Sequence, residues 1–388
     1  MVFCFSAFLL AYCVMTGLTI WGWTRPEKSA KDPKVPVSER PRIGVVIPVR
    51  NEMDNILNLL EDLELQDYPK ELYEAIVVDD QSEDGTKEIV LENRARFSFS
   101  IKVLSLPTGA ATGSTKKKAV ELGVKASAGE FILTTDGDCR VPKGWIPAFA
   151  NRFASGDVNF LAGITAFENC RNLFEKVQAA EFAALTGVAA ASMRLGFPTM
   201  CNAANMAFRK QTFIDVGGFE GVDHIVSGDD GFLLEKISRF DPEKVRFLKD
   251  KNAIVRTAPQ KTWMAFYHQR KRWASKWKKH ASPATVGMAV FIFLFHLSFL
   301  ISLFFSLSGN YPPPVFLIQW LVKMSFEWAL IRKVFHFTGD RLFPGVFATL
   351  EVAYSFYAVF FGAAANFGGF TWKGRKYVDL AAVKSYGK

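Results

Sequence analysis

The amino-acid sequence predicts an α/β protein with a doubly wound sheet, flanked at both ends by membrane-spanning helices. Between residues 40 and 258, short β-branched runs alternate with amphipathic stretches of helical spacing. Strands that alternate with helices build a parallel sheet covered on both faces. The two ends of the chain instead carry long apolar runs, whereas most of the charge lies between Arg25 and Lys279. The sequence thus divides into a central polar domain and two apolar ends.

Residues 1–24 are predicted to form an N-terminal transmembrane anchor. The run Val2–Trp23 is long enough to cross the hydrocarbon core, ends in Trp-Gly-Trp, and is followed by Arg25 and Lys28. A signal peptide would carry positive charge before the apolar run and a small-residue cleavage site after it, and neither is present. Positive charge after the run places the N-terminus outside. We therefore expect an integral protein of the bacterial inner membrane whose central domain lies in the cytoplasm.

Three further apolar runs form the predicted C-terminal membrane region, residues 283–370: Ala284–Leu307, Val315–Ile331 and Gly345–Phe367. The first is a clear span. The second carries Lys323 and Glu327 four residues apart, where they can neutralise each other inside a helix bundle, and the third carries Glu351. Three crossings would send the basic tail, residues 371–388, outside, against the bias of positive charge toward the cytoplasm. We expect one of the two weaker segments to be interfacial or re-entrant, with a cytoplasmic tail.

Composition argues against several classes of site. The five cysteines show no paired spacing and the five histidines no zinc-ligand spacing, so neither a disulfide framework nor a zinc site is expected. The net charge is +9, but the positive charge gathers beside the apolar runs. Basic clusters in that position contact anionic lipids, and the sequence carries no nucleic-acid recognition module. We expect membrane lipids as partners and no nucleic acid, and make no prediction of an oligomeric state.

The central domain, residues 40–258, has four predicted strands and three predicted helices. The strands are Ile43–Val49, Ala75–Asp79, Ile101–Leu106 and Phe131–Thr135, and the helices are Glu52–Leu65, Gly85–Arg94 and Lys116–Ala126. Ligands of doubly wound sheets bind at the carboxyl ends of the strands. The first, second and fourth strands each end in acidic side chains. We therefore expect the binding site at this edge of the sheet.

Asp136 and Asp138 follow the fourth strand and are separated by one glycine. Residues two apart in an extended segment point to the same side, so the two carboxylates can hold a Mg²⁺ or Mn²⁺ ion together with pyrophosphate oxygens. Such an ion neutralises charge on a departing diphosphate. The alternative is an Asp-Gly-Asp turn that binds nothing. Its position after an apolar strand, on the same edge as the other carboxylates, favours the metal site.

Asp79 and Asp80 follow the second strand, where acidic side chains accept hydrogen bonds from ribose hydroxyls in dinucleotide-binding folds. The alternative is a capping role for Asp80, Ser82 or Asp84 at the next helix, and both interpretations can hold for different residues. The run Lys116–Lys118 could approach phosphates. A run of charges is more often a solvated helix face, and we favour that interpretation.

Two further clusters lie later in the chain. Asp229 and Asp230 precede an apolar run, where a carboxylate could remove a proton from a hydroxyl or could cap a helix; the residue pattern favours neither. Residues 259–282 are predicted to form an amphipathic interfacial segment that contains Gln269–Trp273. Arginine pairs with phosphate and an aromatic ring stacks on sugar, so this segment is a candidate for substrate contact.

These clusters, in this order, resemble the motifs of the family 2 glycosyltransferases. The resemblance covers residues 41–273 and rests on five segments: Val46–Glu52, Val77–Ser82, Thr135–Asp138, Gly228–Asp230 and Gln269–Trp273. A single Asp-x-Asp is common, whereas five motifs in order are specific. The resemblance implies a mixed α/β sheet of the GT-A type, the nucleotide-diphospho-sugar transferase fold. It also implies an inverting, metal-dependent transfer of a sugar.

The resemblance implies roles for individual residues. Asp138 would be the chief metal ligand with Asp136 beside it, and Asp230 would be the general base with Asp229 next to it. The donor nucleotide would contact Pro48, Arg50, Glu52, Asp79, Asp80, Lys118 and Asp136. The acceptor channel would be lined by Asn202, Asn205, Gln269, Arg270, Arg272 and Trp273.

Two residues depart from the family pattern: Gly137 stands where alanine is usual, and Asp229 where glutamate is usual. The membrane segments resemble those of ceramide glucosyltransferases and polysaccharide synthases, and the tail from Trp372 resembles the former. The resemblance implies transfer from a nucleotide sugar, a UDP-sugar by family, to a hydroxyl of a lipid or lipid-linked saccharide. The alternatives are a processive polysaccharide synthase, a sugar-phosphate nucleotidyltransferase, transfer onto a polyprenyl phosphate, and a catalytically silent membrane scaffold.

Overall fold

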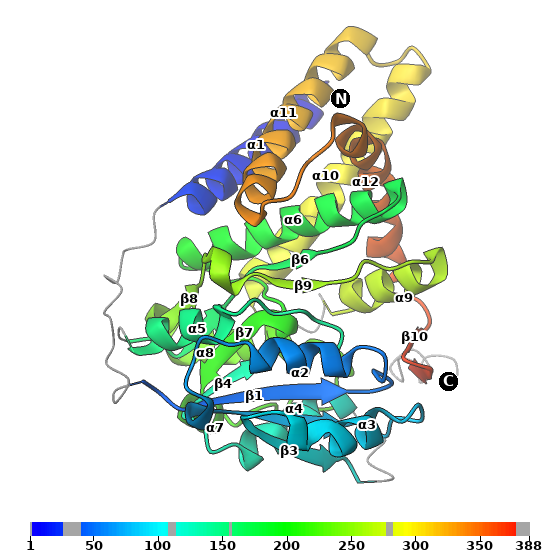
Figure 1. Ribbon diagram of the computed structural model, residues 1–388. Coiled ribbons are helices and arrows are strands. Elements are labelled where there is room, and N and C mark those ends of the chain that lie inside the picture. Colours follow the sequence, from blue (N-terminus) through cyan, green and yellow to red (C-terminus); the bar gives the residue numbers. More distant parts are fainter. Residues whose placement is uncertain (1, 26–39, 108–113, 155–156, 277–281, 378–388) are drawn as a thin grey trace, which may run out of the picture. The chain divides into compact units, whose positions relative to one another are not determined.

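The computed structural model describes residues 2–25, 40–107, 114–154, 157–276 and 282–377, which form two compact units (Figure 1). The sheet unit comprises residues 26–169 and 193–258, and the helical unit comprises residues 1–25, 170–192 and 259–388. Residues 258 and 259 lie in different units. Residues 170–192, however, belong to the helical unit and not to the central domain in which they were predicted.

A seven-stranded mixed sheet forms the centre of the sheet unit, in the order β3-β2-β1-β4-β7-β5-β8. Its strands are β1 (Ile43–Val49), β2 (Tyr73–Asp79), β3 (Ser100–Ser105), β4 (Phe131–Thr134), β5 (Phe160–Ala162), β7 (Met206–Arg209) and β8 (Val245–Phe247). The first four strands run parallel, as predicted, whereas β7 is antiparallel to β4 and β5. A second sheet pairs β6 (Thr165–Phe167) with β9 (Val255–Thr257) in parallel.

Helices connect these strands: α2 (Ile56–Glu64), α3 (Thr86–Asn93), α4 (Thr115–Ala126), α5 (Trp145–Ala154), α7 (Lys210–Asp215) and α8 (Asp229–Phe240). Helix α4 packs very closely on β1. A Cβ atom on Gly123 would lie 2.5 Å from Cγ1 of Val46, so only glycine fits there without a shift. The strand order reverses between β1 and β4, which places a ligand edge at the carboxyl ends of these strands.

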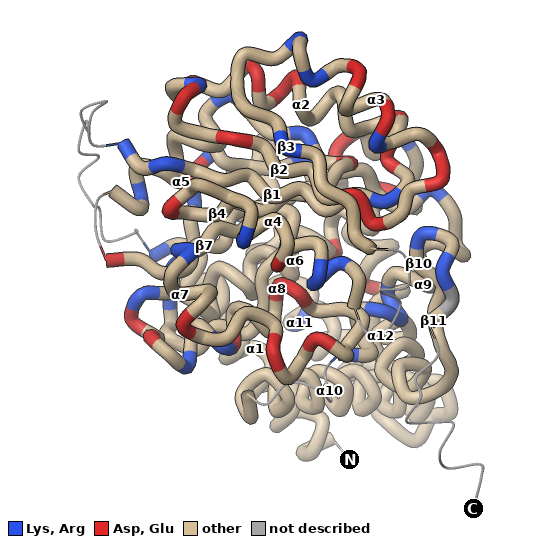
Figure 2. Tube along the Cα trace, turned by 90° about the horizontal axis from the view of Figure 1, so that it is seen from below, with Lys and Arg blue, Asp and Glu red and all other residues tan. Residues whose placement is uncertain are grey.

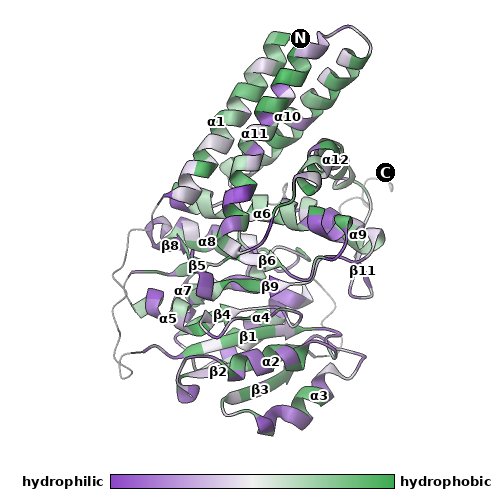
Figure 3. Ribbon diagram, turned by 45° about the horizontal axis from the view of Figure 1, so that its top comes forward, coloured by the Kyte–Doolittle hydropathy of each residue, from purple (hydrophilic) through white to green (hydrophobic). Residues whose placement is uncertain are grey.

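The helical unit contains α1 (Val2–Thr24), most of α6 (Leu173–Arg194), α9 (Trp263–Ala274), α10 (Pro283–Leu307), α11 (Pro313–Thr338), α12 (Pro344–Ala364) and the hairpin of β10 (Phe370–Trp372) and β11 (Arg375–Tyr377). By length and composition, α1, α10, α11 and α12 could each cross a membrane. Figure 3 shows their hydrophobic character, and in Figure 2 α10 is tan because it carries no Lys, Arg, Asp or Glu. Both weaker segments predicted from the sequence therefore form helices of membrane-spanning length.

A buried cluster of charged side chains joins three of these long helices. The expected pair of Lys323 and Glu327 is present at 2.8 Å, and Glu351 of α12 lies 2.7 Å from the same ammonium group. Tyr12 of α1 donates a hydrogen bond to Glu327 at 2.5 Å. The side chains of Lys323 and Glu351 are fully buried. The cluster thus connects α1, α11 and α12 inside the apolar part of the unit.

The beginning of α12 lies beside α6, and its end lies beside α9. At its beginning, Phe347 belongs to an apolar cluster that includes Ala180 of α6. Near its end, the ring of Phe361 lies 6.2 Å from that of Phe266 on α9. The hairpin that follows also contacts α9, because the N–H of Thr371 donates to a ring nitrogen of His268 at 3.3 Å. The chain therefore returns to α9 after α12.

Candidate functional site

The turns after β1 and β2 are tied together by the buried side chain of Arg50. Its NH1 donates to the backbone oxygens of Asp80 and Gln81 at 2.7 and 2.6 Å, and its NH2 lies 3.0 Å from the Glu83 carboxylate. Asn51 and Gln81 adopt left-handed φ angles of 52° and 56° in these turns. Such backbone persists in non-glycine residues where the surroundings fix it, commonly at functional sites. Arg50 thus shapes the predicted nucleotide edge.

The other two residues predicted near the nucleotide on this segment are also fixed by neighbours. Pro48 is in register with Val78 of β2. Glu52 is buried, and its carboxylate accepts a hydrogen bond from Asn55 at 2.8 Å. Both residues lie at the carboxyl end of β1, as the sequence predicted.

The two aspartates at the end of β2 have different partners. Asp79 accepts hydrogen bonds from the backbone N–H of Ser82 at 3.2 and 3.3 Å and so closes the turn. Asp80 accepts from the hydroxyl of Thr115 at 2.5 Å, which connects the end of β2 to the first turn of α4. Capping of the next helix falls to Asp84, which accepts from a backbone N–H in the first turn of α3 at 3.0 Å. Of the three candidates for this contact, Asp84 is therefore the one that bonds to the start of α3.

Lys116 lies between the carboxylate that follows β4 and the one that begins α8. Its Nζ is 2.7 Å from Oδ1 of Asp136 and 3.3 Å from Oδ2 of Asp229. That Oδ2 is buried and accepts no hydrogen bond from the described residues. The Asp136 side chain is 34% exposed, that of Lys116 16% and that of Asp229 10%. The ammonium group of Lys116 thus contacts the carboxylates of Asp136 and Asp229, at a site that solvent and ligands can reach.

This contact corrects the interpretation of the lysine run as a solvated helix face. Lys117 is buried, and its Nζ donates to the backbone oxygens of Val222 and Ile225 at 2.6 and 2.8 Å. Lys118, the lysine predicted to contact the donor, is half-buried on α4, and it is Lys116 that meets the carboxylates. The sequence held one signal for this: Ser114 caps α4, which puts Lys116 in the first turn beside the strand ends.

The predicted metal motif follows β4 in a turn that packs on β1. A Cβ atom on Gly137 would lie 2.9 Å from Cγ1 of Val49 and 3.0 Å from Cγ of Glu52, which accounts for glycine in place of alanine. Asp138 is exposed and Asp136 half-exposed, and two such carboxylates fit a Mg²⁺ or Mn²⁺ ion that takes its other ligands from phosphate and water. Among the described residues no group of three His, Cys, Asp or Glu could hold a metal, so those other ligands would be required.

Cys139 follows the motif directly and belongs to the hydrophobic core. Its side chain is buried. Burial, and then the carboxylates of Asp138 and Asp136, raise the pKa of the thiol well above its ordinary value. Mg²⁺ and Mn²⁺ prefer oxygen ligands, which Asp136 and Asp138 offer.

The two aspartates at the start of α8 lie in different surroundings. Asp229 is buried and lies beside Lys116. Asp230 is half-buried and accepts a hydrogen bond from the N–H of Gly231 at 2.7 Å, at a helix N-terminus that favours negative charge. Asp230 thus lies in the first turn of α8, Asp229 lies beside Lys116, and the role of either carboxylate as a base stays a prediction.

Of the two predicted acceptor residues in the sheet unit, Asn205 is wholly engaged in the core. Its Oδ1 accepts from the indole N–H of Trp145 at 2.9 Å, and its Nδ2 donates to the backbone oxygens of Ile164 and Ala253 at 2.7 and 2.8 Å. Both amide hydrogens are used, so Asn205 is a buried connector, which corrects its prediction as an acceptor contact. Asn202 is half-buried, and its side chain accepts from the N–H of Ala204 at 2.9 Å.

In the helical unit, the predicted channel residues lie on α9 and point to different neighbours. The guanidinium of Arg270 is buried against Glu181 of α6, and it lies 4.3 Å from the ring of Trp273. Arg272 lies 5.5 Å from the ring of Trp372 in the hairpin. Arg270 is therefore a structural residue rather than a lining residue of a channel, which corrects that prediction. Its partner Glu181 was not singled out from the sequence.

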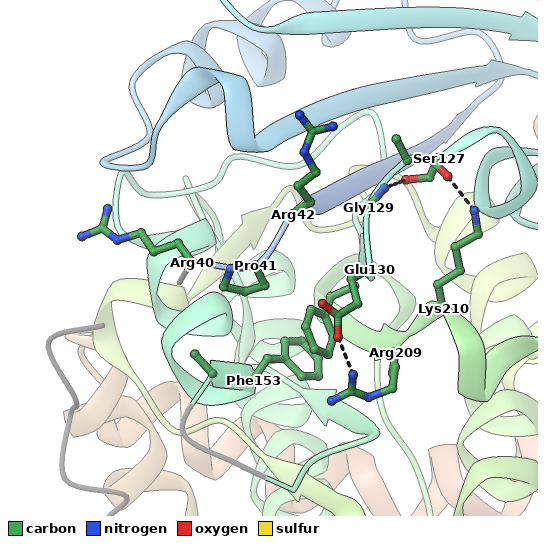
Figure 4. A pocket seen from close by; sticks show the side chains of 12 residues that line it. Arg40, Pro41, Arg42, Ser127, Gly129, Glu130, Phe153, Arg209 and Lys210 are labelled. Carbon is green, nitrogen blue, oxygen red and sulfur yellow. Dashed lines mark hydrogen bonds and ion pairs between the residues drawn. The ribbon is translucent and has the colours of Figure 1, made fainter. Parts of the chain in front are cut away.

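A cavity of about 620 Å³ lies at the opposite edge of the same sheet, before β1 and β4 (Figure 4). Its lining includes four basic side chains, Arg40, Arg42, Arg209 and Lys210. None of the predicted site residues lines this cavity. Figure 4 shows that two of the basic side chains are engaged locally, Arg209 with Glu130 at 2.5 Å and Lys210 with the backbone oxygen of Ser127 at 2.6 Å. The cavity is therefore separate from the carboxylate site.

Comparisons with known proteins give relatives of one kind. A model of glycosyl transferase family 2 matches residues 44–217, and a model of glycosyl transferase family group 2 matches residues 131–362. The chain is 28% identical over 194 residues to glycosyltransferase AglE of Haloferax volcanii, covering 50% of this chain and 60% of that protein. It is 25% identical over 272 residues to beta-monoglucosyldiacylglycerol synthase of Trichormus variabilis, covering 69% of this chain and 56% of that protein. It thus spans less than two thirds of these relatives.

Among solved structures, the mannosyltransferase PcManGT of Pyrobaculum calidifontis, determined in complex with GDP-Man and Mn²⁺, is similar over the whole chain. The TM-score is 0.55 at 18% identity, and 100% of this chain and 99% of that chain are covered. This similarity confirms the GT-A fold that the motif order implied. The family-group model alone covers more than half of the sequence, and this chain belongs to the family 2 glycosyltransferases.

Proposed function

We propose that this protein transfers a sugar from a nucleotide-sugar donor to a hydroxyl group of a lipid or lipid-linked saccharide. The observation that carries the proposal is that the first turn of α4 contacts acidic residues from three separate motifs: Asp80, Asp136 and Asp229. Family membership and the GT-A fold support the class of reaction. A relative named for a glucosyldiacylglycerol product supports a lipid acceptor.

The donor binds at the carboxyl ends of β1, β2 and β4. Its ribose meets Asp80, and its diphosphate lies beside Asp136 and Asp138. These two carboxylates hold a Mg²⁺ or Mn²⁺ ion, which when bound neutralises the charge that develops on the departing diphosphate. Lys116 already lies at Asp136, so a small movement of its ammonium group brings it to a phosphate oxygen.

A carboxylate at the start of α8 takes the proton from the acceptor hydroxyl. The hydroxyl oxygen attacks the anomeric carbon, the bond to the nucleoside diphosphate breaks, and the configuration inverts. The family resemblance assigns the base to Asp230, while Asp229 lies beside Lys116 on the donor side. Gln269, Arg272 and Trp273 serve the acceptor, as the resemblance implies, although Trp273 does so through its contact with Arg270.

We propose a membrane topology that is supported by the contact between the hairpin and α9. Because Thr371 bonds to His268, the hairpin and α9 lie on one side of the membrane, so the chain between them crosses it an even number of times. Two of α10, α11 and α12 then cross, and α12 does not, since both of its ends lie beside α6 and α9. Positive charge at Arg25 and at the hairpin favours the cytoplasm for this side.

A transfer assay on the detergent-solubilised protein tests the proposal. Nucleotide sugars are supplied with a lipid extract, and the released nucleotide and the anomeric configuration of the product are measured. We expect nucleoside diphosphate, released only with both metal and acceptor, and an inverted product. Asp230→Asn should abolish transfer and leave donor binding intact, and Asp229→Asn is the matched comparison. Full transfer in both variants would show that neither aspartate is the base.

The same assay separates the alternatives by their products. Release of pyrophosphate would indicate a nucleotidyltransferase, and a ladder of products would indicate a processive synthase. Transfer onto polyprenyl phosphate that survives in Asp230→Asn would indicate an acceptor that needs no base. Absence of both donor binding and transfer in folded protein would indicate the silent scaffold.

A further inference from the structure

Helix α9, which carries the Gln269–Trp273 motif, presents two opposite faces to two neighbours. One face packs on α6 and has residues at helical spacing: Trp263, Phe266, Arg270 and Trp273. The other face meets the hairpin through His268 and Arg272. Successive helical residues are about 100° apart, so Gln269 lies between the two faces. The rotation of α9 about its axis therefore decides where Gln269 points.

Arg270 is seated on α6 by a single carboxylate. Its Nε lies 3.2 and 3.1 Å from the two oxygens of Glu181, and its NH2 lies 2.5 Å from Oε2. The Arg270 side chain is fully buried and that of Glu181 is 6% exposed. The rings of Phe266 and Trp273 lie 4.5 and 4.3 Å from the guanidinium carbon. Burial disfavours the cation, but Glu181, and after it the side chain of Tyr357, outweigh this and keep the pKa of Arg270 above its ordinary value.

The remaining nitrogen of Arg270 orients Gln269. Its NH1 donates to the side-chain oxygen of Gln269. Arginine has only donors, so the amide must turn its oxygen toward Arg270 and its NH2 group away. Within the described part of the chain, that NH2 group donates no hydrogen bond, and Gln269 is half-buried. The two amide N–H groups are thus available to a ligand.

We infer that Glu181 is a positioning residue of the acceptor site. Through Arg270 it fixes the rotation of α9 and turns the Gln269 amide so that its N–H groups bind an oxygen of the acceptor. The inference rests on the proposed function and narrows it, because the group that Gln269 recognises must be a hydrogen-bond acceptor, such as a hydroxyl or phosphate oxygen. It also assigns Trp273 to holding Arg270 rather than to stacking on sugar.

The first test removes the hydrogen-bond donor group of Gln269 and keeps the packing around it. Gln269→Glu retains an oxygen for Arg270 and replaces the NH2 group by a second oxygen. We expect the melting temperature and the donor affinity to be unchanged and the KM for the acceptor to rise about tenfold or more. An unchanged KM would overturn the role of the amide N–H groups.

The second test separates positioning from simple stability. Glu181→Gln leaves the buried cation of Arg270 without its carboxylate partner and is expected to lower the melting temperature. The double variant Glu181→Leu with Arg270→Met removes both charges and should restore the melting temperature. We expect the double variant to keep wild-type donor affinity but lose about tenfold in kcat/KM for the acceptor, because Gln269 is no longer oriented. Recovery of kcat/KM together with the melting temperature would overturn the inference.

The controls distinguish this inference from the proposed function. Asp157→Asn removes an ion pair with Lys244 whose carboxylate is 81% exposed, and it should change neither property. If wild-type protein neither binds a nucleotide sugar nor transfers a sugar, the proposed function fails and the inference with it. If wild-type protein transfers and both the Gln269 variant and the double variant match it, only the inference fails.

Discussion

The sheet edge and the helical unit hold charged clusters of similar composition, and the two differ in their access to water. At the sheet edge Lys116 and Asp136 are 16% and 34% exposed, so a ligand can replace one protein contact by another. In the helical unit Lys323 and Glu351 are fully buried, and Arg270 likewise. The buried charges in the helical unit are stabilised by their protein partners, because burial removes their hydration. Exposure therefore separates charges suited to binding from charges that hold helices together.

The sharpest test of the comparison at the sheet edge is Asp138→Asn. We expect transfer to fall about a thousandfold, roughly 4 kcal/mol in transition-state stabilisation, because the metal loses its chief carboxylate. The thermal stability of the donor-free protein should remain near that of wild type, since Asp138 is exposed. Steady-state transfer and melting curves of the same preparation measure both. Unchanged transfer would remove Asp138 from the site.

The converse test in the helical unit is Lys323→Met. Removal of the ammonium leaves Glu327 and Glu351 buried without their shared cation, and we expect a loss of about 3–5 kcal/mol in unfolding free energy. Thermal unfolding in detergent measures the loss. The variant that also carries Glu351→Gln should regain part of it. A stable single variant would show that the cluster does not join the helices.

A smaller loss of stability is expected from Asn205→Ala. This change leaves the indole N–H of Trp145 and two backbone oxygens without partners, which costs about 2–3 kcal/mol. The acceptor KM should not change, because Asn205 is a core residue in this structure. Asn202→Ala is the matched control at a half-buried position. A raised KM with normal stability would return Asn205 to the acceptor site.

The smallest stability effect is expected from Lys116→Met. The pair with Asp136 is partly exposed, so its loss should cost at most about 1 kcal/mol in unfolding free energy. Affinity for the nucleotide sugar should nevertheless fall about tenfold, because a phosphate contact is lost. Lys118→Met serves as the control on the same helix, and titration calorimetry measures both. Equal affinities in the two variants would contradict the role given to Lys116.

Local pattern was enough to predict much of the sheet unit. The β-branched run Ile43–Val49 matches β1 residue for residue, and the parallel order of the first four strands follows from their alternation with helices. Spacing did not predict that β7 is antiparallel to β4. It also did not predict that residues 170–192 belong to the helical unit. Both depend on contacts between segments far apart in the chain, which spacing alone does not report.

The site was predicted where chemistry follows directly from a strand end and missed where it depends on a distant partner. Asp80 and Asp136 lie at the predicted edge. Lys116 was read as part of a solvated face because only the folded α4 brings it to Asp229. The sequence does not reveal that Arg270 is a structural residue, because its partner, Glu181, lies far away in the chain. Charged residues therefore need their partners known before a role is assigned.

The central claim is that the sheet edge binds a nucleotide sugar with a divalent metal. A thermal-shift panel of nucleotide sugars on the solubilised protein, with Mg²⁺, with Mn²⁺ and with chelator, tests it most directly. We expect one nucleotide sugar, a UDP-sugar by family resemblance, to raise the melting temperature, and chelator or Asp138→Ala to remove the rise. Folded protein that responds to no nucleotide sugar, or responds equally with chelator, would contradict the account.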